Sequence, residues 1–111
     1  MHRIKIPLIS EEIWIYVGMD EWKAWIAKCT KYGAKPEIFE NLTPEFTNEG
    51  RAIGTYLWVG SKKHPDIVFH ELAHALSIIY ECLNIGPEEE EFRAYIAGHV
   101  QGEAHKWLIS D

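Results

Sequence analysis

Residues 65–83, PDIVFHELAHALSIIYECL, decide the fold of this chain because they specify one long amphipathic helix. At about 100° of rotation per residue, the apolar positions form one continuous stripe, made of Leu72, Leu76, Ile79 and Leu83. His70, Glu71 and His74 fall outside that stripe. Packing in the core therefore explains the leucines, whereas the two histidines face away from that core.

The sequence carries signals for both ends of this helix. Pro65 suits the first turn, where its missing N–H has no intrahelical partner, and Asp66 is favoured beside the positive end of the helix dipole. The segment Asn84-Ile85-Gly86 closes the helix near Leu83. Pro87 then opens a last helix, which is predicted to continue to about Ile109.

The N-terminal part of the chain predicts strands followed by one helix. Residues 13–17, IWIYV, are β-branched and aromatic, and they predict a strand that pairs with residues 3–9. Asp20 is expected to cap a helix that runs to about Tyr32 and ends at Gly33.

Residues 34–51 contain prolines, asparagines and Gly50, and they predict a loop with little regular structure. Residues 52–60 predict one strand, with one face formed by Ile53, Thr55, Leu57 and Val59. The element order predicts an α+β fold, a small sheet with an N-terminal helix and two long C-terminal helices. A chain of 111 residues suits one domain, residues 1–111.

The charge composition argues against two classes of binding partner. The net charge of -6 argues against nucleic acid and against an anionic membrane surface, since both require clustered Lys and Arg. No apolar run approaches the length of a membrane span, and the N-terminal residues lack the pattern of a signal peptide. We therefore expect a cytoplasmic protein in which Cys29 and Cys82 are buried free thiols, with a Cys29–Cys82 bridge as the alternative.

The HELAH segment, His70 to His74, is an HExxH motif. Residues four apart on a helix lie on one face, so the two imidazoles can hold one cation, and Zn²⁺ is the cofactor we expect. Zinc lowers the pKa of a bound water toward neutrality. Glu71 is close enough on the helix to take a proton from that water and pass it to a leaving amine. The motif predicts peptide-bond hydrolysis with Glu71 as general base.

A catalytic zinc site needs a third protein ligand, and the acidic run at residues 88–91 offers one. Glu91 is the first choice because it shares a helical face with Gly98 and Gly102. Small residues would let this helix approach the HELAH helix closely and bring Glu91 to the metal. Glu90 points about 100° away from that face and is the second choice.

Three further residues are candidates for polar roles at the site. His99 is predicted either to be a ligand or to donate to the oxyanion that forms when water attacks a carbonyl. Tyr95 and Tyr56 are weaker candidates for the same donor role. For each of the three, partial exposure or aromatic packing is the simpler explanation.

These motifs resemble the gluzincin branch of the zincin superfamily, which pairs HExxH with a Glu on the following helix, often as ExxA. Here residues 91–94 match ExxA. Small phage-encoded or ImmA/IrrE-like metallopeptidases are the most similar members, with HExxHA followed by ExxAY. The resemblance implies a minimal zincin-like fold, Zn²⁺ held by His70, His74 and Glu91, and a peptide or protein substrate paired along residues 52–60. SprT-like proteins are similar too, and their third His would correspond to His99.

A second function class stays open. The chain can instead be a non-catalytic zincin-like binding protein, a phage or mobile-element factor that engages a host protein through its acidic, aromatic surface. The metal would then be structural or vestigial, and a closed shell of four protein ligands that includes His99 would favour this reading. A metal-free domain in which the motif is incidental is the third alternative.

Overall fold

The computed structural model describes residues 1–110 and confirms the predicted α+β class. The strands are β1 (His2–Ile6), β2 (Glu11–Val17), β3 (Gly50–Ile53) and β4 (Tyr56–Val59). The helices are α1 (Gly18–Lys31), α2 (Pro65–Cys82) and α3 (Glu90–Ile109), with a short 3₁₀ helix, η1 (Pro36–Phe39). The strand order is β1-β2-β4-β3, in which β2 and β4 are parallel and the other two pairs are antiparallel.

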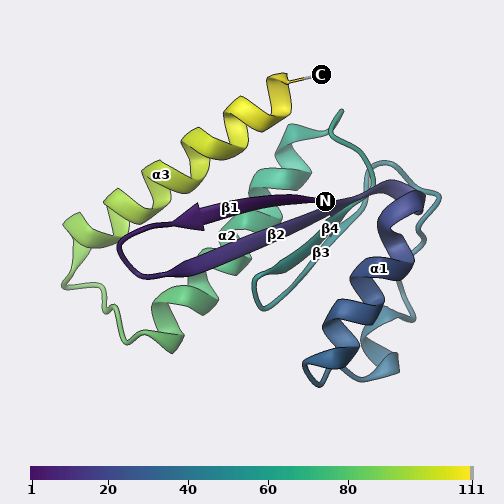
Figure 1. Ribbon diagram of the computed structural model, residues 1–111, viewed down its shortest axis with the longest axis horizontal. Helices are drawn as coiled ribbons and strands as arrows, with labels where there is room; N and C mark the ends of the chain where they lie inside the picture. Colours follow the sequence, from purple (N-terminus) through teal and green to yellow (C-terminus); the bar gives the residue numbers. More distant parts are fainter. Residues whose placement is uncertain (111) are drawn as a thin grey trace.

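The sheet separates two cores. Helices α2 and α3 pack with the aliphatic face of the strands. Helix α1 packs on the other face, where its Trp25 joins Trp58 of β4 in an aromatic core. Figure 1 shows α2 passing behind the strands while α3 runs beside β1. The predicted pairing of the first two strands is confirmed, with Ile4 opposite Ile13. None of the helices in residues 1–110 has the length and apolarity needed to cross a membrane.

Helix α2 buries the stripe that its sequence predicts. Its buried apolar residues are Val68, Leu72, Ala75, Leu76 and Ile79. Leu83, the last residue assigned to the stripe, is 40% exposed because the helix ends at Cys82. The stripe is therefore correct over the length of the helix and ends one residue short of its predicted limit.

The single strand predicted for residues 52–60 is wrong, because this segment forms the hairpin of β3 and β4. A two-residue loop, Gly54-Thr55, joins the strands and pairs Ile53 with Tyr56. Gly54 has a φ of +60°, as required at the first loop position of a type II′ turn. Glycine adopts this conformation without the steric cost that a Cβ would impose.

The hairpin also changes which residues share a face. Residues directly opposite in an antiparallel pair point to the same side, so Ile53 joins Tyr56 in the aromatic core and Ala52 joins Leu57 beneath α2. The predicted alternation continued through the turn and so placed Ile53 on the wrong face.

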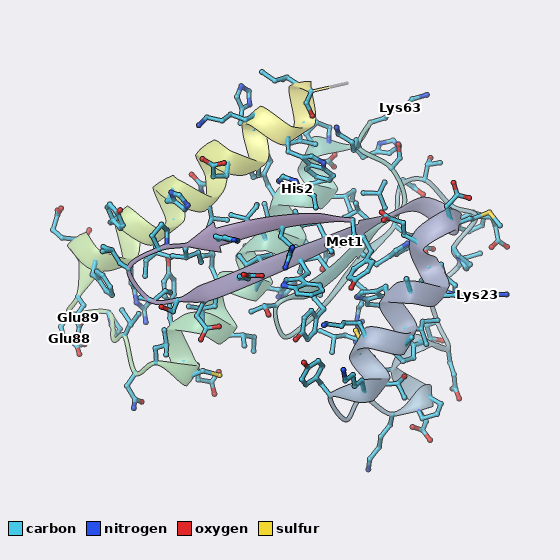
Figure 2. The ribbon with its side chains drawn as sticks, in the orientation of Figure 1. Met1, His2, Lys23, Lys63, Glu88 and Glu89 are labelled. Carbon is cyan, nitrogen blue, oxygen red and sulfur yellow. The ribbon has the colours of Figure 1, made fainter. Side chains whose placement is uncertain are left out.

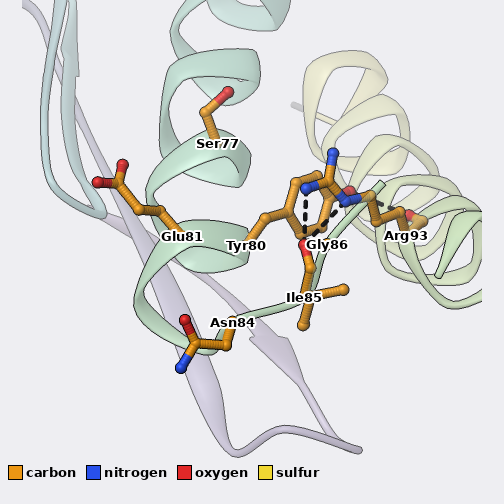
Figure 3. A pocket seen from close by; sticks show the side chains of 7 residues that line it. All are labelled: Ser77, Tyr80, Glu81, Asn84, Ile85, Gly86 and Arg93. Carbon is orange, nitrogen blue, oxygen red and sulfur yellow. Dashed lines mark hydrogen bonds between the residues drawn. The ribbon is translucent and has the colours of Figure 1, made fainter. Parts of the chain in front are cut away.

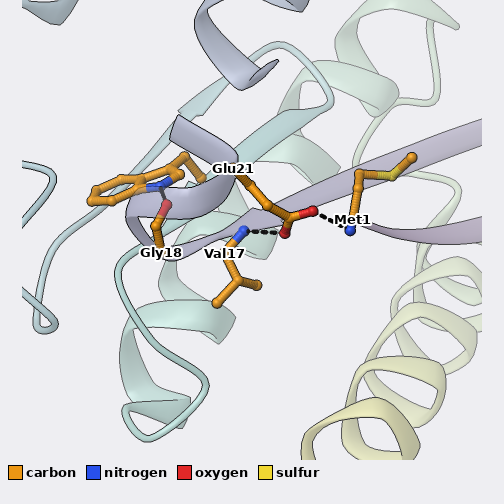
Figure 4. Close-up of polar contacts among 5 residues, drawn as sticks. Met1, Val17, Gly18 and Glu21 are labelled. Carbon is orange, nitrogen blue, oxygen red and sulfur yellow. Dashed lines mark hydrogen bonds and ion pairs between the residues drawn. The ribbon is translucent and has the colours of Figure 1, made fainter. Parts of the chain in front are cut away.

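Helix α1 begins at Gly18, so the prediction that Asp20 caps it is wrong. Val17 occupies the cap position, and its N–H donates to Oε1 of Glu21 at 2.8 Å (Figure 4). The same carboxylate pairs with the N-terminal ammonium of Met1. The Glu21 carboxylate, in the first turn of the helix, thus satisfies the N–H of the cap residue, much as in a capping box but one residue farther along the helix.

The other helix ends agree more closely with the bounds predicted from the sequence. Helix α1 ends just before Tyr32, and α2 has its predicted start at Pro65. Helix α3 begins at Glu90, not at Pro87, because the N–H of Glu89 donates to the carbonyl of Gly86 and forms a turn first.

The loop predicted for residues 34–51 is largely confirmed, apart from η1 and the start of β3 at Gly50. Both cysteines are free, which excludes the disulfide in this structure. Cys29 is buried, and burial raises the pKa of its thiol to about 11. Cys82 is exposed, so its predicted burial is wrong: it is the last residue of α2 and lies beyond the packed stripe.

We expect Leu72→Ala to lower the free energy of unfolding by about 2–5 kcal/mol, because it removes a fully packed side chain from the core between α2 and the sheet. Leu83→Ala makes the same chemical change at an exposed site and should cost less than about 1 kcal/mol. Urea denaturation of both variants measures the difference, and equal losses would contradict the assigned core face of α2.

Candidate metal centre

Helix α2 presents the two histidines of HELAH together on its exposed side. The Nε2 atoms of His70 and His74 are 3.2 Å apart, and the rings meet edge to face. Two nitrogens bound tetrahedrally to zinc at about 2.0–2.1 Å would lie roughly 3.3 Å apart. Without a metal, this contact is a hydrogen bond between the two rings. With one, the same separation suits the two nitrogens as ligands of a single cation.

Glu71 lies between this histidine pair and the core. It is the one charged side chain that is buried among residues 1–110, with 6% of its surface exposed. Burial raises the pKa of its carboxyl group, while His70, His74, Arg51 and a hydrogen bond from the Ala52 backbone oppose that rise. A buried carboxylate with a raised pKa beside an open pocket is the type of group that serves as a general base.

Gly50 allows β3 to lie directly against α2 at this point. A Cβ built on Gly50 would meet Cγ2 of Ile67 at 2.7 Å and Cγ of Glu71 at 3.1 Å. Only a residue without a side chain fits at this crossing. Composition does not indicate this role, since Gly50 lies at the end of a segment that is predicted only as a loop.

The histidines and Glu71 line a pocket of about 500 Å³ between α2 and the β3–β4 hairpin. Arg51, Ala52 and Gly54 line it from the hairpin, and Ser77 and Ile78 line it from the next turn of α2. An adjoining pocket of about 520 Å³ shares residues with it and extends toward the start of α2, where it is lined by Glu49 and Asp66. The two pockets share Gly50, His70 and Glu71, and together they are called the trough below.

A third pocket continues from Ser77 toward the C-terminal end of α2 (Figure 3). Its polar groups are largely committed to structure. The Nε and Nη2 atoms of Arg93 donate to the carbonyl of Ile85 at 3.0 and 2.6 Å, and the Tyr80 hydroxyl donates to the Arg93 carbonyl at 3.0 Å. These bonds tie the start of α3 to the end of α2 and fix the turn between them.

The structure does not bring Glu91 to the histidine pair. The described part of the chain contains no group of three or more His, Cys, Asp or Glu side chains that is arranged to hold a metal. The expected packing of Gly98 and Gly102 against α2 is wrong, because both are exposed and a Cβ on either would meet nothing within 4 Å. Glu91 is exposed on that same solvent side, while α3 buries Ile96, Val100 and Ala104.

The remaining predicted polar residues lie elsewhere. The Nε2 atom of His99 contacts the carbonyl oxygen of Lys5 at 2.6 Å and so joins α3 to β1. Tyr95 is 50% exposed on α3, and Tyr56 packs with the aromatic core of α1. Glu90 is exposed at the first turn of α3.

The acidic run before α3 is solvated. Figure 2 shows Glu88 and Glu89 at one end of the molecule, and both are exposed. This placement is what acidic residues at a helix start favour without any metal.

Comparison with profiles of known protein families, with curated proteins and with solved structures finds no match for this chain. The chemistry of the site is therefore inferred from the chain's own residues. Those that the structure brings together are His70, Glu71 and His74, with Gly50 and Arg51 as additions from β3.

Gly50→Ala should lower the free energy of unfolding by about 1–3 kcal/mol, because the added methyl group must displace Ile67 or Glu71. The matched control is Gly98→Ala in α3, where the methyl group meets nothing and helix propensity should stabilise the protein by roughly 0.5–1 kcal/mol. Thermal or chemical denaturation gives both values. A neutral Gly50→Ala would show that β3 and α2 are not in close contact.

Proposed function

We propose that this protein is a zinc-dependent peptide hydrolase whose reaction centre is His70, Glu71 and His74. The observation that carries the proposal is the 3.2 Å separation of the two Nε2 atoms, in an open pocket beside the buried carboxylate of Glu71. The gluzincin resemblance of the sequence supports the same chemistry. The free thiols favour a cytoplasmic location for the protein.

The residues at the site supply two of the three protein ligands that a catalytic zinc ion needs. His70 and His74 supply two imidazoles with the separation that one tetrahedral ion requires. Glu91 remains a prediction from the sequence pattern, and its exposed position here lends it no support. A zinc ion held at this pair would supply a Lewis acid and make a water molecule acidic near neutral pH.

Glu71 performs the proton transfers in this mechanism. The water oxygen bonds to the carbonyl carbon and the C–N bond breaks. The Glu71 carboxylate accepts the proton that the water loses and delivers it to the nitrogen of the leaving amine. Burial favours proton acceptance, because it raises the pKa of the Glu71 carboxyl group.

The substrate would lie along β3. Of the two edges of the sheet, β1 is covered by α3, with His99 against the carbonyl of Lys5. The other edge, β3, borders the trough that contains the HELAH side chains. An unpaired edge strand can take an extended peptide as an additional strand. The proposed substrate class is therefore an extended segment of a peptide or protein.

The second candidate is a non-catalytic zincin-like protein that binds a partner in the same trough. An open pocket beside an edge strand can hold an extended peptide without cleaving it, which supports this candidate. Metal affinity and hydrolysis separate the two candidates.

We expect wild-type protein supplied with zinc and then freed of excess to retain close to one ion per chain, and His74→Ala to retain almost none. His105→Ala is the control, because His105 is an exposed histidine near the end of α3. Elemental analysis of the three proteins measures this. An equal zinc content per chain in wild type and His74→Ala would refute the proposed site.

Glu71→Gln should keep the zinc and lose hydrolytic activity by about 10²–10⁴-fold, because the amide preserves shape but cannot accept the proton. Cleavage of a quenched fluorogenic peptide library, followed by mass spectrometry of the products, measures the loss. Activity that persists in Glu71→Gln would show that Glu71 is not the general base. A zinc-loaded wild type that cleaves nothing favours the binding protein instead.

A further inference from the structure

Arg51 is the one Lys or Arg among the described residues that line the two pockets at the HELAH segment. It is the second residue of β3 and is exposed. The acidic side chains that share these pockets are Glu49, Asp66 and Glu71. A single permanent cation is thus placed in an otherwise acidic trough.

The position of Arg51 on an edge strand explains how it reaches the pocket. Gly50 and Ala52 face α2, so strand alternation directs the Cα–Cβ bond of Arg51 to the opposite face, alongside Trp58. No strand lies beyond β3 in the sheet, and a long arginine side chain can bend around that open edge. Its positive charge lies close enough to act on the Glu71 carboxylate.

The guanidinium group of Arg51 is not used to hold the fold together. Within residues 1–110 it forms neither an ion pair nor a side-chain hydrogen bond, unlike Arg3, which pairs with Glu12, and Arg93, which donates to Ile85. The carboxylate of neighbouring Glu49 accepts from the N–H of Thr43 at 2.8 Å. All five N–H donors of the guanidinium are therefore open to a ligand.

We propose that Arg51 is a specificity-determining residue that binds a carboxylate of the peptide held along β3. This inference rests on the proposed function, since it uses the same trough. A guanidinium fork matches a carboxylate with two parallel hydrogen bonds, which gives orientation as well as attraction. The carboxylate can belong to an acidic side chain or to the C-terminus of the peptide, and both present the same chemistry to Arg51.

The test compares three alanine-based octapeptides that carry a fluorophore at the N-terminus. One is neutral and amidated, one is amidated with a central Glu, and one is neutral with a free C-terminal carboxylate. Their dissociation constants are measured by fluorescence anisotropy with zinc-treated wild type, Arg51→Gln and Lys63→Gln. Lys63 is the matched control, because it is an exposed cation that points away from the body of the molecule (Figure 2).

Wild type and Lys63→Gln should bind either the central-Glu peptide or the peptide with a free C-terminus about five- to tenfold more tightly than the neutral amidated peptide. Arg51→Gln should lose that preference. Preference for the central Glu assigns an acidic side chain, and preference for the free terminus assigns a C-terminal carboxylate. The inference is overturned if Arg51→Gln keeps the preference, if wild type shows none, or if no peptide binds.

Zinc content and peptide cleavage, measured on the same samples, separate this inference from the proposed function. Wild type without zinc or cleavage would refute the hydrolase while an Arg51-dependent preference still stood, because Arg51 is no metal ligand. Conversely, zinc-dependent cleavage with no role for Arg51 would refute this inference alone.

Discussion

The packing of α2 against the sheet decides where every side chain of the HELAH segment points. Val68, Leu72 and Ala75 are fully or almost fully buried, and they hold one side of the helix against the strands. The opposite side, with His70 and His74, must then face outward. Glu71 lies at the boundary between the two sides. That boundary position accounts for a carboxylate that is buried in the fold and yet lines an open pocket.

The two edge strands of the sheet have different surroundings, and this difference shapes the site. Helix α3 packs against β1, and its His99 occupies the backbone carbonyl of Lys5. The same packing takes α3 toward β1 and leaves its glycine face in solvent, so Glu91 is not delivered to the histidines. The other edge, β3, stays beside the HELAH segment, and Gly50 lets the strand and helix lie in contact.

Local patterns in the sequence were sufficient for the parts of the molecule that depend on one helix or one strand. The stripe on α2, the pairing of β1 with β2 and the shared face of His70 and His74 follow from periodicity alone. The hairpin at Gly54 was missed because alternation of apolar residues continues through a two-residue turn; the Gly-Thr pair was the available signal. The placement of Glu91 depends on how two helices pack, and helical spacing within α3 holds no information about that.

X-ray absorption spectroscopy of zinc-loaded protein would show whether two imidazoles of α2 hold one divalent ion. We expect a first shell at about 2.0–2.1 Å that contains two imidazole rings, with the remaining positions filled by oxygen. The outer-shell scattering typical of imidazole should fall in His70→Ala. A zinc shell without imidazole, or an unchanged spectrum in His70→Ala, would show that His70 and His74 do not hold the ion.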